Sequence, residues 1–389
     1  MARSAAASAE RLSLLCAAVS DVRTSPPPGG VDPAFWRGRR VLVTGHTGFK
    51  GAWLSLWLQL LGAELTGLSD GVPTSPSLFG LAGVQGALSH VVADVRDAAA
   101  VASAVAKSRP EVVIHMAAQP MVRRSFVAPR ETYETNVMGT VSVLEAVRTA
   151  GTDSVRAVVN VTSDKCYENR EDGSRSPRPF TEDDPMGGHD PYSNSKGCAE
   201  LVTDAYRRSF FSGPDDGPRV ASARAGNVIG GGDWGEDRLV PDIMRAATAR
   251  TPIAIRNPEA VRPWQHVLNP LSGYLVIAQA LMGADPAAAA AGWNFGPAQD
   301  DVRPVRWITD RLAEQWPEPL QWAVDPGPHP HEAQFLSLDS TRARERLGWR
   351  PRWDLARTTA SIVAWHLSHR EGADMRTVTL QQIEEFSAS

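Results

Sequence analysis

Short apolar segments alternate with longer helical segments over the first half of this chain. The expected strands cover residues 41–43, 63–69, 89–93, 112–116, 155–162 and 219–223, and the expected helices cover residues 49–61, 97–107, 131–149 and 191–211. Strands that are apolar throughout are buried on both faces, and strands that alternate with helices form a parallel sheet. The sequence therefore predicts an α/β fold with a doubly wound parallel sheet, covered by helices on both faces.

The alternation ends near residue 223, and this change divides the chain into regions. Residues 1–34 are rich in Ala and Ser and include a proline run, which is typical of a flexible N-terminal extension. Residues 35–223 form the predicted sheet domain, and an apolar segment near 292–297 adds a return strand. Residues 224–291 and 298–389 combine Gly, Trp and Pro clusters with helices, so we expect a smaller, interleaved C-terminal domain there.

The charge balance excludes several classes of partner. The 40 basic and 44 acidic side chains give a net charge of -4, so there is no electrostatic reason to expect nucleic acid or an anionic membrane as a partner. No apolar run reaches the eighteen or so residues that a membrane-spanning helix needs. A protein without nucleic-acid or membrane partners is therefore expected.

The cysteines indicate the compartment and argue against a structural zinc site. Cys16, Cys166 and Cys198 are odd in number and widely spaced, which is typical of a reducing cytoplasm and not of a disulfide framework. No Cys-x-x-Cys pair is present, and we expect no metal. The candidate ligands that stand closest together lie in a proline-rich loop without helical spacing, and they are His329, His331 and Glu332.

A glycine loop, GHTGFKG, lies between the first expected strand and the first expected helix. In a GxxGxxG loop the first Gly permits the tight turn, the second lets the backbone approach a pyrophosphate, and the third lets the helix pack on the strand. The helix N-terminus then offers N–H groups to the anion. The strand–loop–helix context favours a dinucleotide site over a plain turn. Its candidate residues are Gly45, Thr47, Gly48, Phe49, Lys50 and Gly51.

Residues at the ends of the next strands extend this dinucleotide site. Asp70 follows the second strand, 19 residues beyond Gly51, and a carboxylate there accepts from ribose hydroxyls and repels a 2′-phosphate. NAD is therefore favoured over NADP, although Ser69 is an alternative for that position. Further candidates follow the third and fourth strands, and they are Asp94, Val95, Ala117, Ala118 and Gln119.

A tyrosine and a lysine stand four residues apart at the start of a helix. Asp190 and Pro191 are the expected N-cap and first helical residue, so Tyr192 and Lys196 share one helix face. A lysine ammonium beside a phenol favours the phenolate, which lets Tyr act as a base near neutral pH. A surface pair is the alternative, but the glycine loop upstream favours the catalytic interpretation.

Together the loop and this pair resemble the extended short-chain dehydrogenase/reductase family, whose sheet is of the Rossmann type. The resemblance implies that the loop binds NAD, that Tyr192 is the acid/base and that Lys196 also holds the nicotinamide ribose. A Ser or Thr at the end of the fifth strand completes the family's triad, and Ser163 stands there. Asn136 matches the family's structural asparagine on the long helix, and we include it in the cofactor site.

The residues after the triad hydroxyl resemble those of nucleotide-sugar 4,6-dehydratases. Members acting on dTDP-glucose carry Thr-Asp-Glu, whereas this chain has Ser163-Asp164-Lys165. The lysine resembles the branch that acts on CDP-glucose, as do the strings TGHTGFKGAWLSLWL, HMAAQPMVRRS, SDKCYEN, PYSNSKGCAE and RPWQHVLNPLSGYL. The resemblance covers roughly residues 35–365. It implies a lyase that oxidises C4 of CDP-glucose, eliminates water across C5 and C6, and returns the hydride from tightly bound NAD.

The resemblance assigns roles to the two residues after Ser163. Asp164 is the expected acid for the departing 6-hydroxyl and Lys165 the expected base at C5. A lysine acts as a base only when neutral, so Lys165 can instead orient the sugar or pair with Asp164. Ser163 is expected to hydrogen-bond the oxygen at C4.

Cationic and amide side chains in the second half of the chain are expected to bind the diphosphate and sugar, because phosphates require such donors. By resemblance Asn227 and Arg262 take this role, and the smaller domain becomes the substrate domain. Arg123 and Arg238 are further candidates, for which a solvated surface charge is the alternative. The resemblance also implies a homodimer built through the helices that begin at residues 131 and 191.

Two other functions compete with this one. Another NAD-dependent nucleotide-sugar dehydratase or a 4-epimerase uses the same fold, because one fold hosts many functions. An epimerase needs no acid/base pair for elimination, so Asp164 and Lys165 argue against it. A non-catalytic NAD sensor is expected to lack Tyr192 or Lys196, and both are present.

Overall fold

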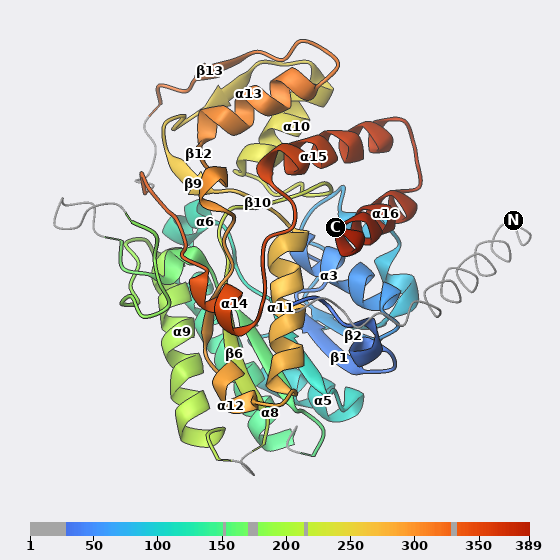
Figure 1. Ribbon diagram of the computed structural model, residues 1–389, viewed down its shortest axis with the longest axis vertical. Helices are drawn as coiled ribbons and strands as arrows, with labels where there is room; N and C mark the ends of the chain where they lie inside the picture. The colour runs from blue at the N-terminus through green and yellow to red at the C-terminus, as the bar shows by residue number, and fades with distance from the viewer. Residues whose placement is uncertain (1–28, 151–152, 170–177, 214–216, 328–332) are drawn as a thin grey trace, which may run out of the picture.

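A computed structural model describes residues 29–150, 153–169, 178–213, 217–327 and 333–389. Most of the expected N-terminal extension, Cys16, and the residues His329, His331 and Glu332 lie outside these ranges. The chain forms a large lobe around a sheet and a smaller lobe packed beside it (Figure 1). Among the described helices, none combines the length and the apolar character that a membrane crossing requires.

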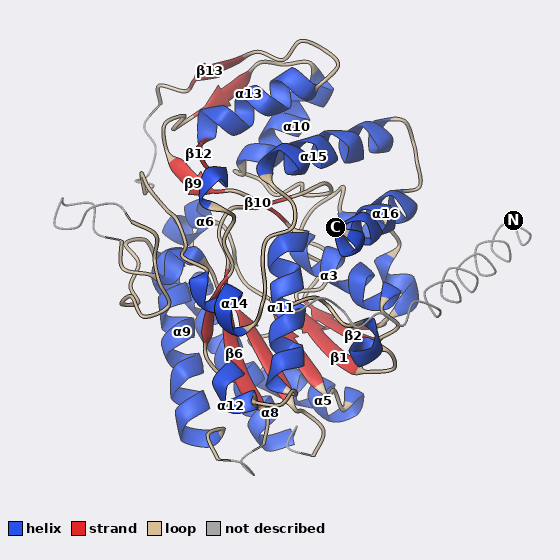
Figure 2. Cartoon of the chain, in the orientation of Figure 1, coloured by secondary structure: helices blue, strands red, loops and turns tan. Residues whose placement is uncertain are grey.

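A seven-stranded parallel sheet forms the centre of the large lobe, shown in red in Figure 2. Its strands are β1 (Arg40–Thr44), β2 (Glu64–Ser69), β3 (Ser89–Val92), β4 (Val112–His115), β5 (Ala157–Val161), β6 (Arg219–Arg224) and β11 (Gly292–Asn294). They lie in the order β11-β6-β5-β4-β1-β2-β3, and every neighbouring pair is parallel. The predicted doubly wound parallel sheet is confirmed, including the return strand near residue 293.

Helices cover both faces of this sheet. Val41 and Val43 share one core with α3 (Phe49–Leu60) and α11 (Leu268–Leu281). Leu42, between those valines, belongs to a second core with α5 (Ala98–Ser108), α8 (Gly139–Ala150) and α9 (Pro191–Phe210). Successive strand residues point to opposite faces, so an uninterrupted apolar strand contributes to both cores. The placement of α11 differs from the expected division, because this helix packs on the sheet although residues 224–291 were assigned to the smaller domain.

The long helix expected over residues 131–149 is interrupted. Its first part is α7 (Pro129–Tyr133), and a π-helical turn, η3 (Glu134–Met138), joins this part to α8. A π turn inserts an extra residue and re-aims the side chains around it. Here the turn carries Asn136, whose amide reaches the loop after β4. Simple helical periodicity does not reveal such a turn.

The smaller lobe has short strands, three packed helices and a core of its own. The core includes Ile243 and Met244 from α10, Ile308 and Leu312 from α13, and Ile362 from α15. The strands pair as β7 with β10, β8 with β13 and β9 with β12. Their bounds are β7 (Val228–Ile229), β8 (Ile253–Ile255), β9 (Val261–Pro263), β10 (Gln265–His266), β12 (Val302–Pro304) and β13 (Trp322–Val324), and the three helices are α10 (Leu239–Ala249), α13 (Val305–Gln315) and α15 (Leu355–Arg370).

Several short elements complete the large lobe or join the two lobes. They are α2 (Pro33–Trp36), α4 (Leu78–Leu81), η2 (Val84–Ala87), α6 (Val122–Val127), η4 (Asp164–Cys166), α12 (Pro286–Ala289), η5 (Gln299–Asp301) and α14 (Thr341–Arg346).

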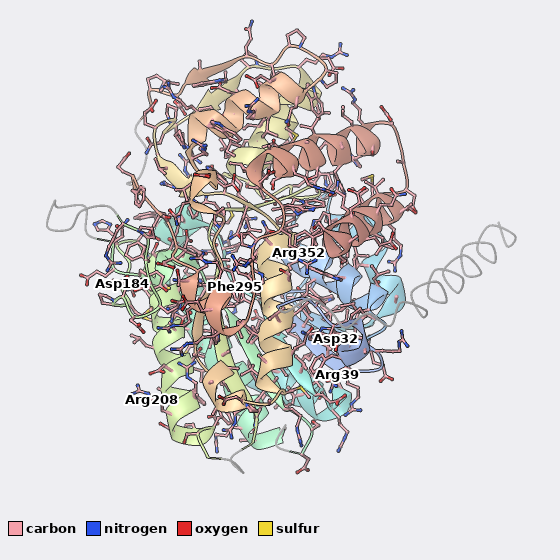
Figure 3. All side chains as sticks on the ribbon, viewed as in Figure 1. Asp32, Arg39, Asp184, Arg208, Phe295 and Arg352 are labelled. Atoms are coloured by element: carbon pink, nitrogen blue, oxygen red, sulfur yellow. The ribbon has the colours of Figure 1, made fainter. Side chains whose placement is uncertain are left out.

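The C-terminal helix α16 (Met375–Ala388) returns from the smaller lobe and packs on α3. The Phe386 and Trp57 rings meet edge to face with centroids 5.6 Å apart, and the guanidinium of Arg376 donates to Gln59 over 2.9 Å. Arg352, labelled in Figure 3, donates to the backbone oxygen of Ser389 over 2.9 Å. The end of the chain therefore connects the smaller lobe to the helix that follows the glycine loop.

Candidate active site

The glycine loop forms a cradle at the carboxyl end of β1. Gly45 has φ +72°, and a Cβ there would lie 2.7 Å from the backbone nitrogen of Ala117. A Cβ on Gly51 would lie 2.1 Å from the carbonyl oxygen of Gly45. The N-cap residue Gly48 has no side chain to bond the first N–H groups of α3, so these donors remain available to an anion. The loop therefore fits the pyrophosphate of a dinucleotide.

Thr47, Ser69 and Asp70 lie together at the end of β2. The Thr47 and Ser69 hydroxyls are 2.7 Å apart, and they lie 2.6 and 3.1 Å from the carbonyl oxygen of Gly71. Both hydroxyls are thus engaged within the loop, whereas the Asp70 side chain is exposed. This arrangement favours Asp70 over Ser69 as the residue that accepts hydrogen bonds from the ribose hydroxyls.

Asp94 and Val95 follow β3 but differ in their surroundings. Asp94 forms an ion pair with Arg96 at 2.5 Å, and the hydrogen bonds from Arg96 lower the pKa of that carboxyl. The Val95 side chain is buried against α8, where a Cβ on Gly139 would lie 2.2 Å from it. Of these two residues, Asp94 therefore offers the polar side chain at the sheet edge.

Asn136 fastens the loop after β4 to the catalytic helix. Its Oδ1 accepts from the backbone N–H of Gln119 over 2.8 Å, and its Nδ2 donates to the Gln119 carbonyl over 3.1 Å and to the Ser195 hydroxyl over 2.9 Å. These bonds use the oxygen and both N–H groups of the amide. The structure therefore gives Asn136 a positioning role. Ala117 and Ala118 lie in the same loop and are half-buried.

Helix α9 begins as the sequence predicts. The N-cap carboxylate of Asp190 accepts from the backbone N–H of Ser193 over 2.9 Å and from its hydroxyl over 2.5 Å, and Pro191 is the first helical residue. Tyr192 and Lys196 follow on one face, and both are buried. The cap fixes the start of the helix and hence the direction of both side chains.

Ser163 and Asp164 lie beside Tyr192, just after β5. The Ser163 hydroxyl donates to Oδ1 of Asp164 over 3.0 Å and also interacts with the Tyr192 phenol. Asp164 is only 2% exposed, and its Oδ2 is a buried atom without a hydrogen-bond partner among the described residues. A buried carboxyl with one free oxygen is suited to give a proton to a bound ligand.

Gly226 makes room for Asp164, and the sequence analysis missed this residue. A Cβ on Gly226 would lie 2.0 Å from Oδ2 and 2.3 Å from Cγ of Asp164. The position therefore requires a glycine if Asp164 keeps its place. The only sequence signal was the place of Gly226 directly before Asn227, a predicted substrate contact.

Burial shifts the pKa values of the central groups. It raises the pKa of Tyr192 to about 12, with Ser163 and Arg238 opposing the shift and Asp164 adding to it. Burial lowers the pKa of Lys196 to about 8, against the attraction of Glu200. Burial also raises the pKa of the Asp164 carboxyl, which Lys165, Ser163 and Arg262 oppose. The Asp164 carboxyl is therefore more readily protonated in this site than an aspartate in water.

Lys50 extends the glycine loop toward these catalytic groups. Its Nζ lies 5.8 Å from the centre of the Tyr274 ring. Burial lowers its pKa to about 7, and repulsion from Lys196 and Arg238 adds to the effect, whereas Asp164 opposes it. The side chain predicted for the cofactor site therefore also faces the catalytic centre.

Lys165 lies close enough to Asp164 to act on it electrostatically, since it lowers the pKa of that carboxyl. Within the described part of the chain, no ion pair at 4.0 Å or less joins the two residues. A tight pair would oppose both the neutral lysine and the protonated aspartate that an elimination requires. The geometry leaves both expected roles of Lys165 open.

The predicted substrate residues come mainly from the smaller lobe. Arg262 is buried, and its positive charge lowers the pKa of the Asp164 carboxyl. Arg238 forms an ion pair with Asp233 at 3.0 Å and interacts electrostatically with Tyr192. The structure therefore brings these two arginines to the catalytic groups. Asn227 lies between the lobes with a φ of +36°, in the left-handed region that asparagine tolerates. Arg123 is farther out and forms an exposed ion pair at 3.1 Å with Asp237, next to Arg238.

Comparisons with known proteins agree with this arrangement. A family model described as GDP-mannose 4,6 dehydratase matches residues 42–362. A CDP-glucose 4,6-dehydratase from Salmonella typhimurium is 49% identical over 362 residues, which cover 92% of this chain and 99% of that protein. A dTDP-glucose 4,6-dehydratase from Streptomyces venezuelae, solved with NAD bound, has a TM-score of 0.69 at 25% identity and covers 87% of this chain and 99% of its own.

Fold similarity alone does not separate the possible activities. A UDP-glucose 4-epimerase from Stenotrophomonas maltophila, with bound NAD, has a TM-score of 0.73 at 20% identity and covers 86% of this chain and 100% of its own. The family model spans residues 42–362, a range that runs through both lobes and contains the positions of Ser163, Asp164, Tyr192 and Lys196. The expected resemblance to nucleotide-sugar dehydratases is confirmed, and the chain belongs to the GDP-mannose 4,6-dehydratase family.

Proposed function

We propose that this chain is a CDP-glucose 4,6-dehydratase, which converts CDP-D-glucose to CDP-4-dehydro-6-deoxy-D-glucose and water. The observation that carries the proposal is the buried carboxyl of Asp164, with its free Oδ2, beside Ser163 and Tyr192. It supplies an acid for elimination in the same site as a Tyr–Lys pair for oxidation. The 49% identity with a CDP-glucose enzyme supports the choice of nucleotide.

NAD fits the cradle of the glycine loop. Gly45, Gly48 and the first turn of α3 would hold the pyrophosphate, Asp70 the adenosine ribose and Lys196 the nicotinamide ribose. When bound, NAD supplies a hydride acceptor that later returns the hydride, so the overall reaction is redox-neutral. Further predicted cofactor contacts follow β3 and β4, and they are Asp94, Val95, Ala117, Ala118 and Gln119.

Tyr192 removes the proton from the 4-hydroxyl while C4 is oxidised. Its buried phenol has a pKa of about 12, so it needs nearby positive charge to act as a base. Arg238 supplies part of that charge. Lys196, which follows Tyr192 by four residues on α9, is the second cation in this proposal. Ser163 hydrogen-bonds the oxygen at C4, which orients the sugar against Tyr192.

Asp164 then protonates the departing 6-hydroxyl. The oxidised C4 acidifies the proton at C5, so a base there completes the loss of water across C5 and C6. Lys165 is the base in this proposal, and its location one residue after Asp164 allows the two groups to act on adjacent carbons. Orientation of the sugar by Lys165 remains the alternative role.

The diphosphate of the substrate requires cationic donors, and the smaller lobe supplies them. Arg262 and Arg238 are close to the catalytic groups, and the carbonyl of Asn227 accepts from the backbone N–H of Gln265 over 3.3 Å. Arg123 reaches the same edge through Asp237. The smaller lobe is therefore the proposed substrate domain.

The chain is also proposed to form a homodimer in the cytoplasm. The outer side of η3 and α9 exposes apolar side chains, with Met138 52% and Leu201 60% exposed. Exposed apolar residues gathered on packed helices are suited to a second copy. Cys166 and Cys198 are free thiols, which supports a reducing compartment.

The test is incubation of the purified protein with CDP-, dTDP-, UDP- and GDP-hexoses. We expect only CDP-glucose to give a product lighter by one water, with the alkaline absorbance of a 4-keto sugar. Loss of water from another nucleotide sugar would keep the mechanism and refute the nucleotide. A product of unchanged mass would support a 4-epimerase and refute the role of Asp164.

A further inference from the structure

Tyr167 directly follows the short helix η4, which carries Asp164 and Lys165. Its side chain is 1% exposed and takes no part in the mechanism proposed above. The hydroxyl donates to Oδ1 of Asn294 over 2.7 Å and accepts from Nη1 of Arg224 over 2.7 Å. One buried phenol therefore ties the end of η4 to two strands of the sheet, β6 and β11.

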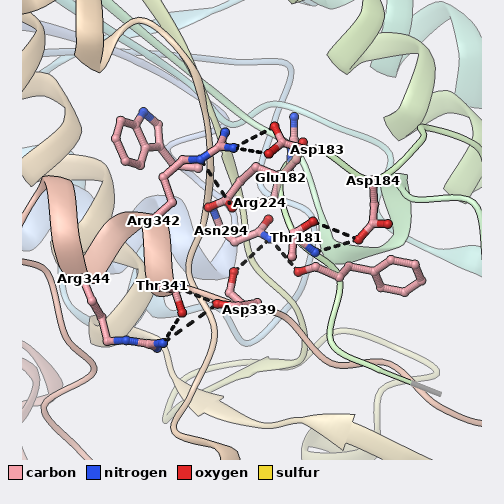
Figure 4. Close-up of polar contacts among 12 residues, drawn as sticks. Thr181, Glu182, Asp183, Asp184, Arg224, Asn294, Asp339, Thr341, Arg342 and Arg344 are labelled. Carbon is pink, nitrogen blue, oxygen red and sulfur yellow. Dashed lines mark hydrogen bonds and ion pairs between the residues drawn. The ribbon is translucent and has the colours of Figure 1, made fainter. Parts of the chain in front are cut away.

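Both partners of the Tyr167 hydroxyl are themselves held in place. Nη2 of Arg224 forms an ion pair with the buried carboxylate of Glu200 over 2.7 Å. Nδ2 of Asn294 donates to the carbonyl of Asp339 over 3.2 Å, which fixes the direction in which Oδ1 of the same amide points (Figure 4). The hydroxyl therefore meets a donor and an acceptor whose positions are set by their own contacts.

The ring of Tyr167 is fixed as well as its hydroxyl. It stacks on the Phe180 ring, with the centroids 4.9 Å apart and an angle of 3° between the ring planes. The backbone N–H of Phe180 donates to the Ser337 carbonyl over 2.9 Å, and the Phe180 carbonyl accepts from Nδ2 of Asn294 over 2.9 Å. A ring that is held on its face and at its hydroxyl leaves little freedom to the backbone that bears it.

The two ends of η4 are held by different parts of the molecule. Before its start, the backbone N–H of Thr162 donates to the Ala223 carbonyl over 2.9 Å, so Ser163 follows directly on the sheet. At its end, the side chain of Tyr167 makes the contacts described above. The start of the turn therefore determines where Ser163 lies beside Tyr192, whereas the end determines how the turn carries its acid and its base.

We propose that Tyr167 is a positioning residue for the elimination of water, because it fixes the turn that presents Asp164 to C6 and Lys165 to C5. Oxidation at C4 does not depend on it, since Tyr192 and Lys196 lie on α9, which has an N-cap of its own. The proposal rests on the proposed function, which assigns the acid and the base to this turn. It predicts that the two half-reactions separate when the hydroxyl is removed.

The test is Tyr167→Phe, which keeps the ring and its stacking on Phe180 but removes both hydroxyl bonds. Enzyme with bound NAD is mixed with a smaller amount of the nucleotide sugar that the wild type dehydrates. Near-ultraviolet absorbance of the reduced nicotinamide follows oxidation at C4, and mass spectrometry of quenched samples follows the loss of water. We expect oxidation at nearly the wild-type rate and water loss slowed about 10-fold or more, because small displacements of catalytic groups have effects of this size.

Tyr206→Phe is the matched control, because it removes a phenol hydrogen bond of the same length, 2.7 Å to Glu145, near the C-terminal end of α9. Both half-reactions should keep their wild-type rates in this variant. Phe180→Leu is a second variant, which removes the stacked ring and leaves the hydroxyl bonds of Tyr167. It should also slow water loss relative to oxidation, by a smaller factor, and it tests the proposal if Tyr167→Phe does not fold.

An unchanged rate of water loss in the folded variants would overturn the proposal. A fall of both half-reactions by the same factor would overturn it as well, because it would indicate a purely structural role for Tyr167. A wild type that oxidises C4 but releases no water would instead refute the proposed function, and the role of Tyr167 in elimination with it. Slower water loss confined to the Tyr167 and Phe180 variants, in a wild type that releases water, would support both.

Discussion

Replacement of Asp164 by Asn tests the central element of the proposed mechanism. The amide has the shape of the carboxyl, so its Oδ1 can still accept from Ser163, but it has no acidic proton to give. Asp164 is 2% exposed, so water cannot easily replace it as the acid. General acids contribute about 10²- to 10⁴-fold to rates, which corresponds to about 3–5 kcal/mol of barrier. We expect kcat to fall by that factor while KM changes little.

The assay follows both halves of the reaction separately. The near-ultraviolet absorbance of reduced nicotinamide reports oxidation at C4, and mass spectrometry reports the loss of water. We expect Asp164→Asn to oxidise C4 and to accumulate the reduced cofactor, because Tyr192 is intact. Asp301→Asn is the control, since burial also raises the pKa of that half-buried carboxyl in the smaller lobe. Near-normal release of water from Asp164→Asn would refute the assignment of the acid.

Three further predictions concern packing, assembly and pH. Gly226→Ala places a Cβ 2.0 Å from Oδ2 of Asp164 and should lower kcat about 100-fold. Gly86→Ala is the control, because Gly86 has open space around it, and it should leave kcat unchanged. A normal kcat in Gly226→Ala would contradict the tight packing. Leu201→Asp should convert the proposed dimer to a monomer, as measured by light scattering, and an unchanged dimer mass would place the interface elsewhere. Burial, reinforced by the charge of Lys196, lowers the pKa of His115 to about 3. Because the unfolded state takes up a proton at this histidine below about pH 6.5, the free energy of unfolding should fall by about 1.4 kcal/mol per pH unit below that pH. Urea unfolding should show a shallower acid dependence in His115→Gln, and equal slopes would exclude this contribution.

The sheet could be predicted because its information is local. Strands β1, β4 and β5 are short apolar runs between turn residues, and the glycine loop marks the first strand-to-helix connection. The catalytic helix carries its own start signal in Asp190 and Pro191. The sequence also located Ser163 and Asp164, because a specific motif follows the fifth strand.

Features that depend on distant contacts could not be predicted. Gly226 matters because the loop after β6 packs so tightly on Asp164 that a Cβ at this position would lie 2.0 Å from Oδ2. Glu200 looks like an ordinary helical carboxylate until β6 brings Arg224 to it. Helix α11 is apolar on nearly all sides, and such a helix could be buried in either lobe. Its packing on the sheet was therefore not evident from its composition. Such contacts join residues far apart in sequence, and periodicity carries no signal for them.

The similarity to both dehydratases and an epimerase raises the question of which residues distinguish dehydration from epimerisation. The Tyr192–Lys196 pair and the glycine loop suffice for oxidation at C4, which both activities need, so they cannot separate them. Elimination needs in addition an acid that is protonated near neutral pH, and burial provides it by raising the pKa of Asp164. Gly226 lies directly against this carboxyl, and Arg262 of the smaller lobe is close enough to act on its charge. In the proposed mechanism, the choice of reaction therefore depends on the surroundings of one carboxyl, to which residues of both lobes contribute.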